Sequence, residues 1–440
     1  MSTSDQSSAM YPAGRTRTTT DDLRRLMGFL DDSPSPYHVV TSAARALERA
    51  GFPRVAETAD WSGVGSGYVV RGGAVVAWRG PAAGVTRALP IRIVGAHTDS
   101  PGLRVKPRPD TGVLGWKQLA VEVYGGVLLN SWLDRDLGVA GRLMLRSGEE
   151  LLVDLHEPIA RVPQLAIHLD REVNERGLLL DKQQHLTPVW GTGSPTAGEF
   201  ASFVAQQSGI DSGTDIAAWD LCLYDITPAA IIGADAALLA SGRLDNQVSC
   251  WAAIEALTSA PASDEMLSVI ALFDHEEVGS ESTSGAAGPL LEHVLERLFL
   301  TGGASRDTYL RSLAGGMCIS ADNAHAVHPN YVERHEPGHR PLVNAGPAIK
   351  VNANQRYATS ASTAVLFENL CRKADVPVQS FVSRNNMPCG STIGPITATR
   401  LGIATVDVGV PQLSMHSARE LCGTDDPVYL ASALREFFTP

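Results

Sequence analysis

The chain has 440 residues, enough for more than one domain, and its 44% hydrophobic and 19% charged residues are typical of a globular protein. Its 36 Lys and Arg against 48 Asp and Glu leave a net charge of −12, so nothing indicates the basic surface of a nucleic-acid binder. No apolar run reaches the ~18 residues of a membrane span. We therefore expect neither nucleic acid nor membrane as a partner.

The N-terminal residues and the cysteines indicate where the protein resides. Residues 1–20 are polar and lack the apolar segment of a secretory signal, so they are predicted to form a flexible tail. Six cysteines lie scattered without the paired spacing of a disulfide framework or a zinc ribbon. This pattern is typical of a reducing compartment, and we expect a cytoplasmic protein.

The first predicted elements are a helix and a strand. Apolar side chains at helical spacing predict an amphipathic helix over residues 36–51, and the apolar run 91–94 predicts a buried strand. Beyond residue 102 the pattern changes to short strand-like pieces between turn residues: 120–124, 126–129, 151–155 and 219–226. Residues 191–215, rich in Gly, Ser, Thr and Gln, are predicted to form a mobile loop.

After residue 233 buried strands and helices alternate. The predicted strands are 266–273, 317–319 and 403–410, and the predicted helices are 248–258, 289–300 and 361–373. Uninterrupted apolar strands are typical of a parallel or mixed sheet that helices cover on both faces. We expect an α/β domain made of residues 21–101 and 234–440, interrupted by a β-rich insertion over residues 102–233.

Polar clusters follow four of the apolar runs. They are His97-Thr98-Asp99, Asp274-His275-Glu276-Glu277, Asp322-Asn323 and Ser414-Met415-His416-Ser417. A fifth, Gly242-Arg243-Leu244-Asp245-Asn246, directly precedes a predicted helix. Because ligands bind at the carboxyl ends of strands in open α/β sheets, these clusters are expected to converge.

The residue types in these clusters indicate a metal site. Two His, two Asp and two adjacent Glu, without a thiolate, suit Zn²⁺, Mn²⁺ or Co²⁺, and they suit a pair of ions that share one carboxylate. One shared carboxylate and two further ligands for each ion make five ligands, which leaves one additional Glu. Of the adjacent Glu276 and Glu277, one can bind metal while the other acts as a general base toward water. Asp99 is placed to hold the imidazole of His97.

Each pattern alone has a simpler explanation. A His-x-Asp pair is usually structural, and adjacent glutamates usually form a solvated turn. The segment Cys389-Gly390-Ser391-Thr392 shows no thiol–His pairing, so we expect a small-residue loop near the pocket. Five further histidines are expected on the surface or in the core: His275, His325, His328, His335 and His339. The metal hypothesis therefore depends on the ordered combination.

Taken together, the motifs resemble those of the aspartyl aminopeptidases. The resembling segments, in the family's order, are GAHTDSPG (95–102), GRLDN (242–246), DHEEVGS (274–280), NANQRYA (352–358) and SMHSARE (414–420), within a similarity from about residue 31 to 438. The resemblance implies a three-layer zinc-exopeptidase core with a mixed, largely parallel sheet, interrupted by a β-rich dimerisation insertion. It also implies two Zn ions per subunit, with Mn or Co possible, removal of N-terminal Asp or Glu from peptides, and dimers assembled into a dodecamer.

The resemblance also implies individual roles. Five residues match the family's metal ligands: Asp245 as the bridge, His97 and Asp322 at one ion, and Glu277 and His416 at the other. Glu276 matches the general base. His168 matches a histidine that reaches the active site of a neighbouring subunit, although the sequence around it predicts only an exposed strand position.

The substrate preference can be argued from charge. Three carboxylates and one hydroxide balance two divalent cations, and Glu276 then makes the predicted site negative. An acidic substrate side chain therefore needs a cation of its own. Lys350, at the end of an apolar run, matches the family position that contacts this side chain, although most lysines lie on the surface. Tyr357 is a candidate donor to the tetrahedral intermediate.

Two alternative functions remain. One is another two-metal aminopeptidase or amidohydrolase without acidic specificity, against which Lys350 and the insertion argue. The other is a non-catalytic, self-assembling scaffold, against which Glu276 and the complete ligand set argue.

Overall fold

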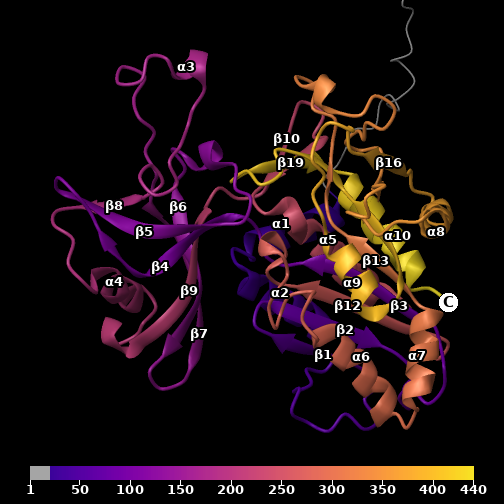
Figure 1. Ribbon diagram of the computed structural model, residues 1–440. Coiled ribbons are helices and arrows are strands. Elements are labelled where there is room, and N and C mark those ends of the chain that lie inside the picture. The colour runs from indigo at the N-terminus through magenta and orange to yellow at the C-terminus, as the bar shows by residue number, and fades with distance from the viewer. Residues whose placement is uncertain (1–19) are drawn as a thin grey trace, which may run out of the picture.

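The computed structural model describes residues 20–440, so the predicted tail 1–20 lies outside the described residues apart from Thr20. Figure 1 shows two parts side by side: a β-rich part formed by residues 102–225, called the β insertion below, and an α/β part formed by the rest. Among the described helices, none has the length and apolarity required to cross a bilayer.

The α/β part is built on a mixed sheet of eight strands in the order β1-β2-β12-β3-β13-β17-β15-β16. The strands are β1 (Ser66–Arg71), β2 (Ala74–Arg79), β3 (Ile91–His97), β12 (Leu267–Phe273), β13 (Met317–Ala321), β15 (Ala348–Val351), β16 (Gln379–Val382) and β17 (Ala404–Gly409). The central neighbours β12, β3, β13 and β17 are parallel. These four are the strands that the apolar runs predicted.

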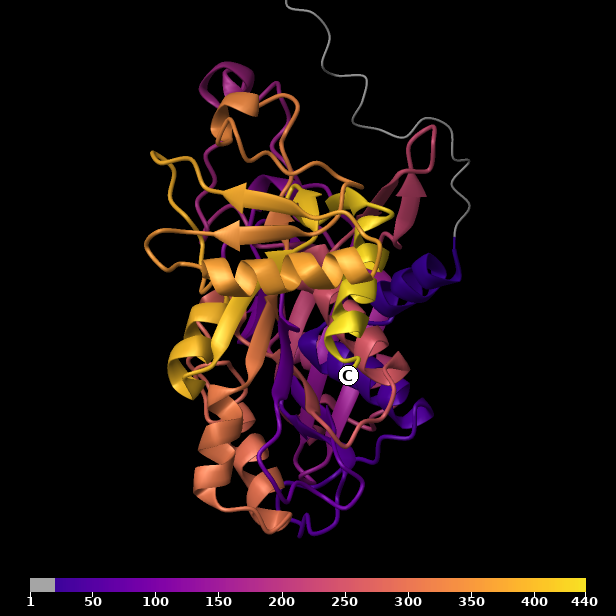
Figure 2. The same ribbon diagram turned by 90° about the vertical axis from the view of Figure 1, so that its right-hand side faces the viewer.

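Helices cover both faces of this sheet. On one face lie α1 (Asp21–Asp31), α2 (Pro36–Arg49), α5 (Leu244–Ser259), α8 (Ala361–Lys373) and α10 (Asp426–Phe437). On the other lie α6 (Leu290–Thr301), α7 (Arg306–Ala314) and α9 (Ile393–Leu401), and Figure 2 shows α6 and α7 on the opposite side from α1 and α2. Successive side chains of a strand point to opposite faces, so Val75 packs in the first layer and Val76 in the second. The four predicted helices are confirmed.

The β insertion carries a six-stranded sheet in the order β7-β6-β9-β4-β5-β8. Its strands are β4 (Gly102–Thr111), β5 (Trp116–Tyr124), β6 (Leu137–Leu145), β7 (Glu150–Ala160), β8 (Val189–Thr192) and β9 (Ile216–Asp225). All of its strand pairs are antiparallel. A segment between β7 and β8 projects from the sheet and holds α3 (Val173–Arg176) (Figure 1).

Two predictions for the β insertion are wrong. Residues 126–129 are not a strand, because the chain turns at Gly125, with φ 73°, and enters the short helix η1 (Leu129–Trp132). Residues 191–215 are not one loop, because they contain α4 (Glu199–Gln207) and the short helix η2 (Gly213–Asp215). Phe200 and Val204 pack α4 into the core of the insertion. Their helical spacing of four residues was overlooked because the surrounding residues are mostly polar.

A third, five-stranded sheet lies next to the carboxyl ends of the main strands. Its order is β10-β11-β19-β18-β14. Its strands are β10 (Ala230–Ile232), β11 (Leu238–Ser241), β14 (Ala324–His325), β18 (Pro411–Leu413) and β19 (Glu420–Gly423). Because β11 leads into α5 and β18 leads into the turn before β19, this sheet brings two further polar clusters to the same edge.

Candidate functional site

Three neighbouring strands carry the first polar clusters to one edge. β3 ends at His97, β13 ends directly before Asp322, and β12 is followed by the short helix η3 (Glu276–Val278). Since β12, β3 and β13 are adjacent and parallel, their carboxyl ends lie together. The expected convergence of these clusters is confirmed by this geometry.

The small sheet adds Asp245 and His416. Asp245 lies at the start of α5, where its backbone departs from helical geometry, and His416 has a left-handed φ of 68°. A left-handed backbone at a residue with a Cβ costs on the order of 1 kcal/mol and is often found at functional sites. The buried carboxylate of Glu420 accepts hydrogen bonds from the backbone N–H groups of Asp245 (2.9 Å) and His416 (2.7 Å). Glu420 therefore holds both residues in place.

The side chains form two groups of potential ligands that share one carboxylate. His97, Asp245 and Asp322 form one group, and Asp245, Glu277 and His416 form the other, each with ligand atoms within 4.8 Å of one another. A third, overlapping group joins His97 to both glutamates, Glu276 and Glu277. Nε2 of His416 lies 3.3 Å from Oδ2 of Asp245 and 3.4 Å from Oε1 of Glu277.

The polar atoms of these groups fit a divalent cation. Oδ1 of Asp245 and Oε1 of Glu277 are buried and accept no hydrogen bond. His97 and His416 each donate from Nδ1 to a backbone carbonyl, that of Asp99 and of Gly126, both at 2.9 Å. Each Nε2 therefore faces carboxylates and can bind a metal ion once it loses its proton. Carboxylate oxygens and imidazole nitrogens are ligands that zinc prefers.

The pKa values of the acidic groups point to the same need for positive charge. Burial raises the pKa of Glu276 to about 7, and the charge of Asp322 adds to this while His97 opposes it. Burial and the charge of Asp245 raise the pKa of Glu277 well above its usual range. Carboxylates packed this closely repel one another unless cations lie between them.

A cavity opens beside these groups and contains two of the other predicted residues. Lys350 and Tyr357 line it together with Glu276 and the ligand groups. Gly390, Ser391 and Thr392 also line it, as expected for a small-residue loop near the pocket. Asn323, from the predicted cluster Asp322-Asn323, lines it as well. His325 and Arg356 also line it but were given no role in the sequence analysis, because a single residue outside a strand-end cluster carries no distinctive pattern.

Lys350 is a buried cation, contrary to the usual surface position of lysine. It is only 2% exposed, and its Nζ donates to the carbonyl of Asn323 at 3.2 Å. The same Nζ lies 3.7 Å from Oδ1 of Asp322 and 5.0 Å from the centre of the Tyr357 ring. A positive charge is therefore held at the wall of the cavity, next to a potential metal ligand.

Two predicted site residues, His168 and Asp99, do not line the cavity. His168 lies exposed in a turn of the projecting segment between β7 and β8, not on a strand as its surroundings predicted. Asp99, by contrast, is completely buried and accepts a hydrogen bond from the backbone N–H of Glu276 at 3.0 Å.

Comparisons with known proteins agree over nearly the whole chain. The family described as aminopeptidase I zinc metalloprotease (M18) matches residues 29–438. A probable M18 family aminopeptidase 2 of Streptomyces coelicolor is 56% identical over 434 residues, covering 98% of this chain and 99% of that protein.

Two solved structures extend this similarity to the fold. The chain matched in the cryo-EM structure of the Ape4 and Nbr1 complex has a TM-score of 0.89 at 35% identity, over 94% of this chain and 84% of that chain. The mApe1 dodecamer of S. cerevisiae has a TM-score of 0.82 at 28% identity, over 95% and 96% of the two chains. The chain therefore belongs to the M18 family and is a zinc metallo-aminopeptidase.

Proposed function

We propose that this enzyme removes N-terminal Asp or Glu from peptides at a centre that holds two metal ions. Asp245 would bridge the ions, His97 and Asp322 would complete one site, and Glu277 and His416 would complete the other. The observation that supports this most strongly is the pair of ligand groups that share Asp245. The buried Lys350 beside them supports the acidic preference.

The chain's own residues would carry the proton transfers. Bound metal ions would supply Lewis acidity, which lowers the pKa of water and polarises the peptide carbonyl. Glu276 would take a proton as water adds to the first peptide carbonyl, and would return it to the leaving amine as the C–N bond breaks. Tyr357, which is buried and whose pKa is raised by burial, would remain protonated and donate a hydrogen bond to the developing oxyanion.

The test of this proposal is hydrolysis of L-aspartyl and L-leucyl chromogenic amides by the full-length protein. The protein is stripped with a chelator and reconstituted with Zn²⁺, Mn²⁺ or Co²⁺. Metal-dependent turnover that strongly favours the aspartyl amide is expected. Preference for the leucyl amide would remove the acidic specificity but leave the metal chemistry, and metal-independent turnover would contradict the metal centre.

Lys350→Met is expected to affect aspartyl substrates selectively. Methionine keeps the length of the side chain but removes the charge that would bind the substrate carboxylate. A hydrogen bond to a charged group contributes about 1.5–3 kcal/mol. Its loss is therefore expected to lower kcat/KM for the aspartyl amide roughly 10–100-fold. The leucyl amide is expected to change by less than about threefold, a shift under 1 kcal/mol.

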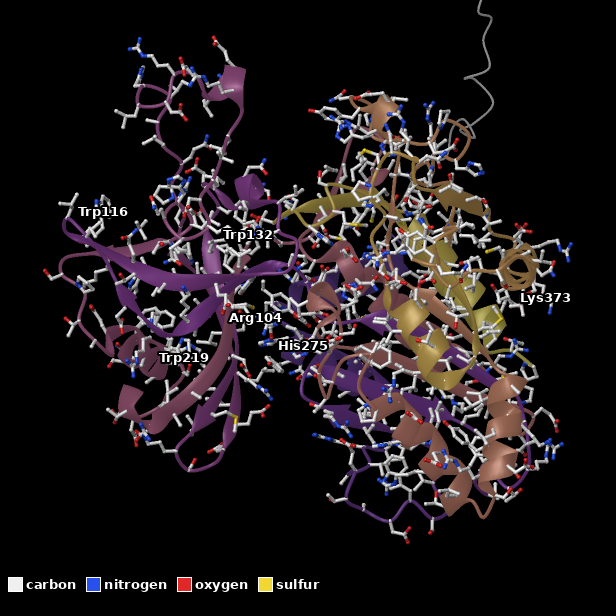
Figure 3. The ribbon with its side chains drawn as sticks, in the orientation of Figure 1. Arg104, Trp116, Trp132, Trp219, His275 and Lys373 are labelled. Atoms are coloured by element: carbon white, nitrogen blue, oxygen red, sulfur yellow. The ribbon has the colours of Figure 1, made fainter. Side chains whose placement is uncertain are left out.

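The matched control for Lys350 is Lys373→Met, at the exposed end of α8 (Figure 3). It is expected to leave both substrates unchanged. Equal losses on the two substrates in the Lys350 variant would show that Lys350 supports the site without selecting the substrate.

We also propose that a second copy of the chain completes the site, within dimers that assemble further. The mApe1 structure with a similar fold is a dodecamer. The projecting segment that carries His168 exposes large apolar side chains, among them Leu179 at 91% and Leu169 at 75%. A second subunit covering this segment would bury these side chains and bring His168 toward the neighbouring cavity. A cytoplasmic location and the dodecamer itself remain predictions.

Coexpression of two inactive variants tests this arrangement. His168→Ala and Glu276→Gln are each expected to be nearly inactive as homo-oligomers. In random mixed dimers, a site with intact Glu276 receives His168 from the other variant, so about a quarter of the wild-type activity is expected to return by simple statistics. If no activity returns although mixed dimers are isolated through two affinity tags, His168 does not act across the interface.

A further inference from the structure

The β insertion contacts the candidate metal centre through one short segment. β5 ends at Tyr124, and the chain then passes along the His416 turn before it enters η1. Tyr124 donates from its hydroxyl to Oδ2 of Asp99 at 2.7 Å. The carbonyl of Gly126 accepts from Nδ1 of His416 at 2.9 Å, and the N–H of Leu128 donates to the His416 carbonyl at 3.0 Å. One segment therefore holds residues on both sides of the centre.

Asp99 connects Tyr124 to three of the site residues. Its carboxylate accepts from the backbone N–H groups of Glu276 at 3.0 Å and Glu277 at 3.1 Å, and its carbonyl accepts from Nδ1 of His97 at 2.9 Å. Oδ2 is shared between Glu277 and Tyr124. The position of the Asp99 carboxylate therefore affects both glutamates, and the Tyr124 hydroxyl is its one side-chain hydroxyl donor among the described residues.

The surroundings of Tyr124 fix its ring. The guanidinium of Arg104 lies 3.7 Å from the ring centre, and the ring of His275 approaches from the α/β part at 6.5 Å. Arg104 and His275 are labelled in Figure 3 at the boundary between the two parts. The next residue, Gly125, has a left-handed φ of 73°, and a Cβ there would lie 3.1 Å from Cβ of Glu277. Close approach to Glu277 therefore favours glycine at this position.

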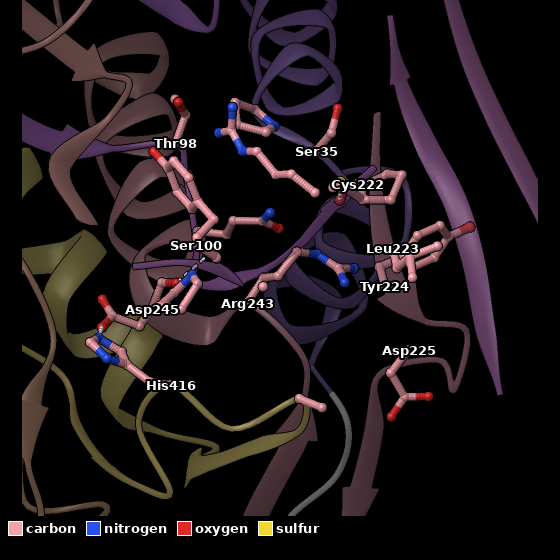
Figure 4. Close-up of a pocket in the computed structure, with 18 of the residues that line it drawn as sticks. Ser35, Thr98, Ser100, Cys222, Leu223, Tyr224, Asp225, Arg243, Asp245 and His416 are labelled. Atoms are coloured by element: carbon pink, nitrogen blue, oxygen red, sulfur yellow. Dashed lines mark hydrogen bonds and ion pairs between the residues drawn. The ribbon is translucent and has the colours of Figure 1, made fainter. Parts of the chain in front are cut away.

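A second cavity lies behind these contacts, between the β insertion and the α/β part. It is lined by Arg104, Tyr124 and Cys222 of the β insertion and by Arg243, Asp245 and His416 of the α/β part. Figure 4 shows Asp245 and His416 on one side of it and Cys222 to Asp225 on the other. Asp245 and His416 line both cavities, so the candidate ligands lie at the boundary between the two parts.

We infer that the β insertion is a structural component of the metal centre, in which Tyr124 is a positioning residue that acts through Asp99, and Gly126 orients His416. This inference rests on the proposed metal ligands. Groups that orient metal ligands from behind typically change metal affinity or activity by 10–100-fold when they are replaced. A residue that only packs the two parts together would change the stability of the protein and leave metal binding unaltered.

The test compares Tyr124→Phe with Tyr224→Phe in the full chain. Tyr224 is a matched control because it lies in the same β insertion, is buried, and donates from its hydroxyl to another aspartate, Asp154. Zn²⁺ affinity is measured by competition with a chelating dye, and the coordination geometry is followed through the visible spectrum of the Co²⁺ form. kcat and KM for the aspartyl amide are determined separately.

Tyr124→Phe is expected to weaken Zn²⁺ binding by about 10–100-fold, to change the Co²⁺ spectrum and to lower kcat with little change in KM. Tyr224→Phe is expected to match the wild type in all of these. In an Asp99→Asn background, Tyr124→Phe is expected to add little, because both changes interrupt the same connection.

Wild-type affinity and spectrum in Tyr124→Phe, or equal effects of the two tyrosine variants, would overturn the inference. Additive losses in the Asp99→Asn background would show that Tyr124 does not act through Asp99. Failure of the wild-type protein to bind metal would instead contradict the proposed function, so the two failures are distinguishable.

Discussion

Replacing Glu276 by Gln is expected to lower kcat by about 10²–10⁴-fold, the usual contribution of a general acid–base group. Glutamine has the same shape but cannot accept and return a proton. Glu276 lies in the cavity beside the two ligand groups, and burial raises its pKa to about 7. The measurement is steady-state hydrolysis of the aspartyl amide together with metal analysis of the same sample.

The metal content of Glu276→Gln is expected to stay at the wild-type level, because the two groups that share Asp245 do not include Glu276. Glu281→Gln, an exposed glutamate a few residues farther on, is the matched control and should keep full activity. Normal turnover in the Glu276 variant would exclude it as the base, and loss of metal would indicate that it is a ligand instead.

Asp245→Asn is expected to remove most of the bound metal and to reduce activity to background. The carboxylate belongs to both ligand groups, so one change weakens both sites. Asparagine preserves the volume but supplies a neutral ligand that bridges two cations poorly. Metal analysis after gel filtration is expected to show well under half of the wild-type content, whereas Asp225→Asn, at a buried aspartate paired with Arg135, should retain it.

The same variant should be less stable than the wild type in both metal states, and the difference should be larger with metal. Without metal, burial disfavours the charge of Asp245, but His416 and His97 outweigh this and hold its pKa below the usual value, so its removal should lower the melting temperature. With excess Zn²⁺, the wild type gains stability by binding, and the variant should lack most of this gain. A metal-induced rise in melting temperature equal to that of the wild type would contradict the bridging role.

Local patterns predicted the α/β core well. The central strands are buried on both faces, so their apolar runs stand out from the sequence, as β12 does with every side chain buried. Helices α2 and α8 were predicted because their apolar side chains recur at helical spacing. Short segments that are buried on only one side were predicted wrongly from their composition. The helix α4 was predicted as a loop, and the turn after Gly125 was predicted as a strand.

The sequence by itself determined which polar side chains follow buried strands, and hence that His97, Glu276, Glu277 and Asp322 converge. Chain connectivity carries this information, because parallel neighbours place their carboxyl ends together. Only the tertiary structure decided that Asp245 lies in both ligand groups, that Lys350 is buried beside Asp322, and that Tyr124 reaches Asp99 from the β insertion. These contacts join residues from separate sheets and from two parts of the fold. The spacing of residues within one helix or strand does not determine how far apart such segments lie in the folded chain.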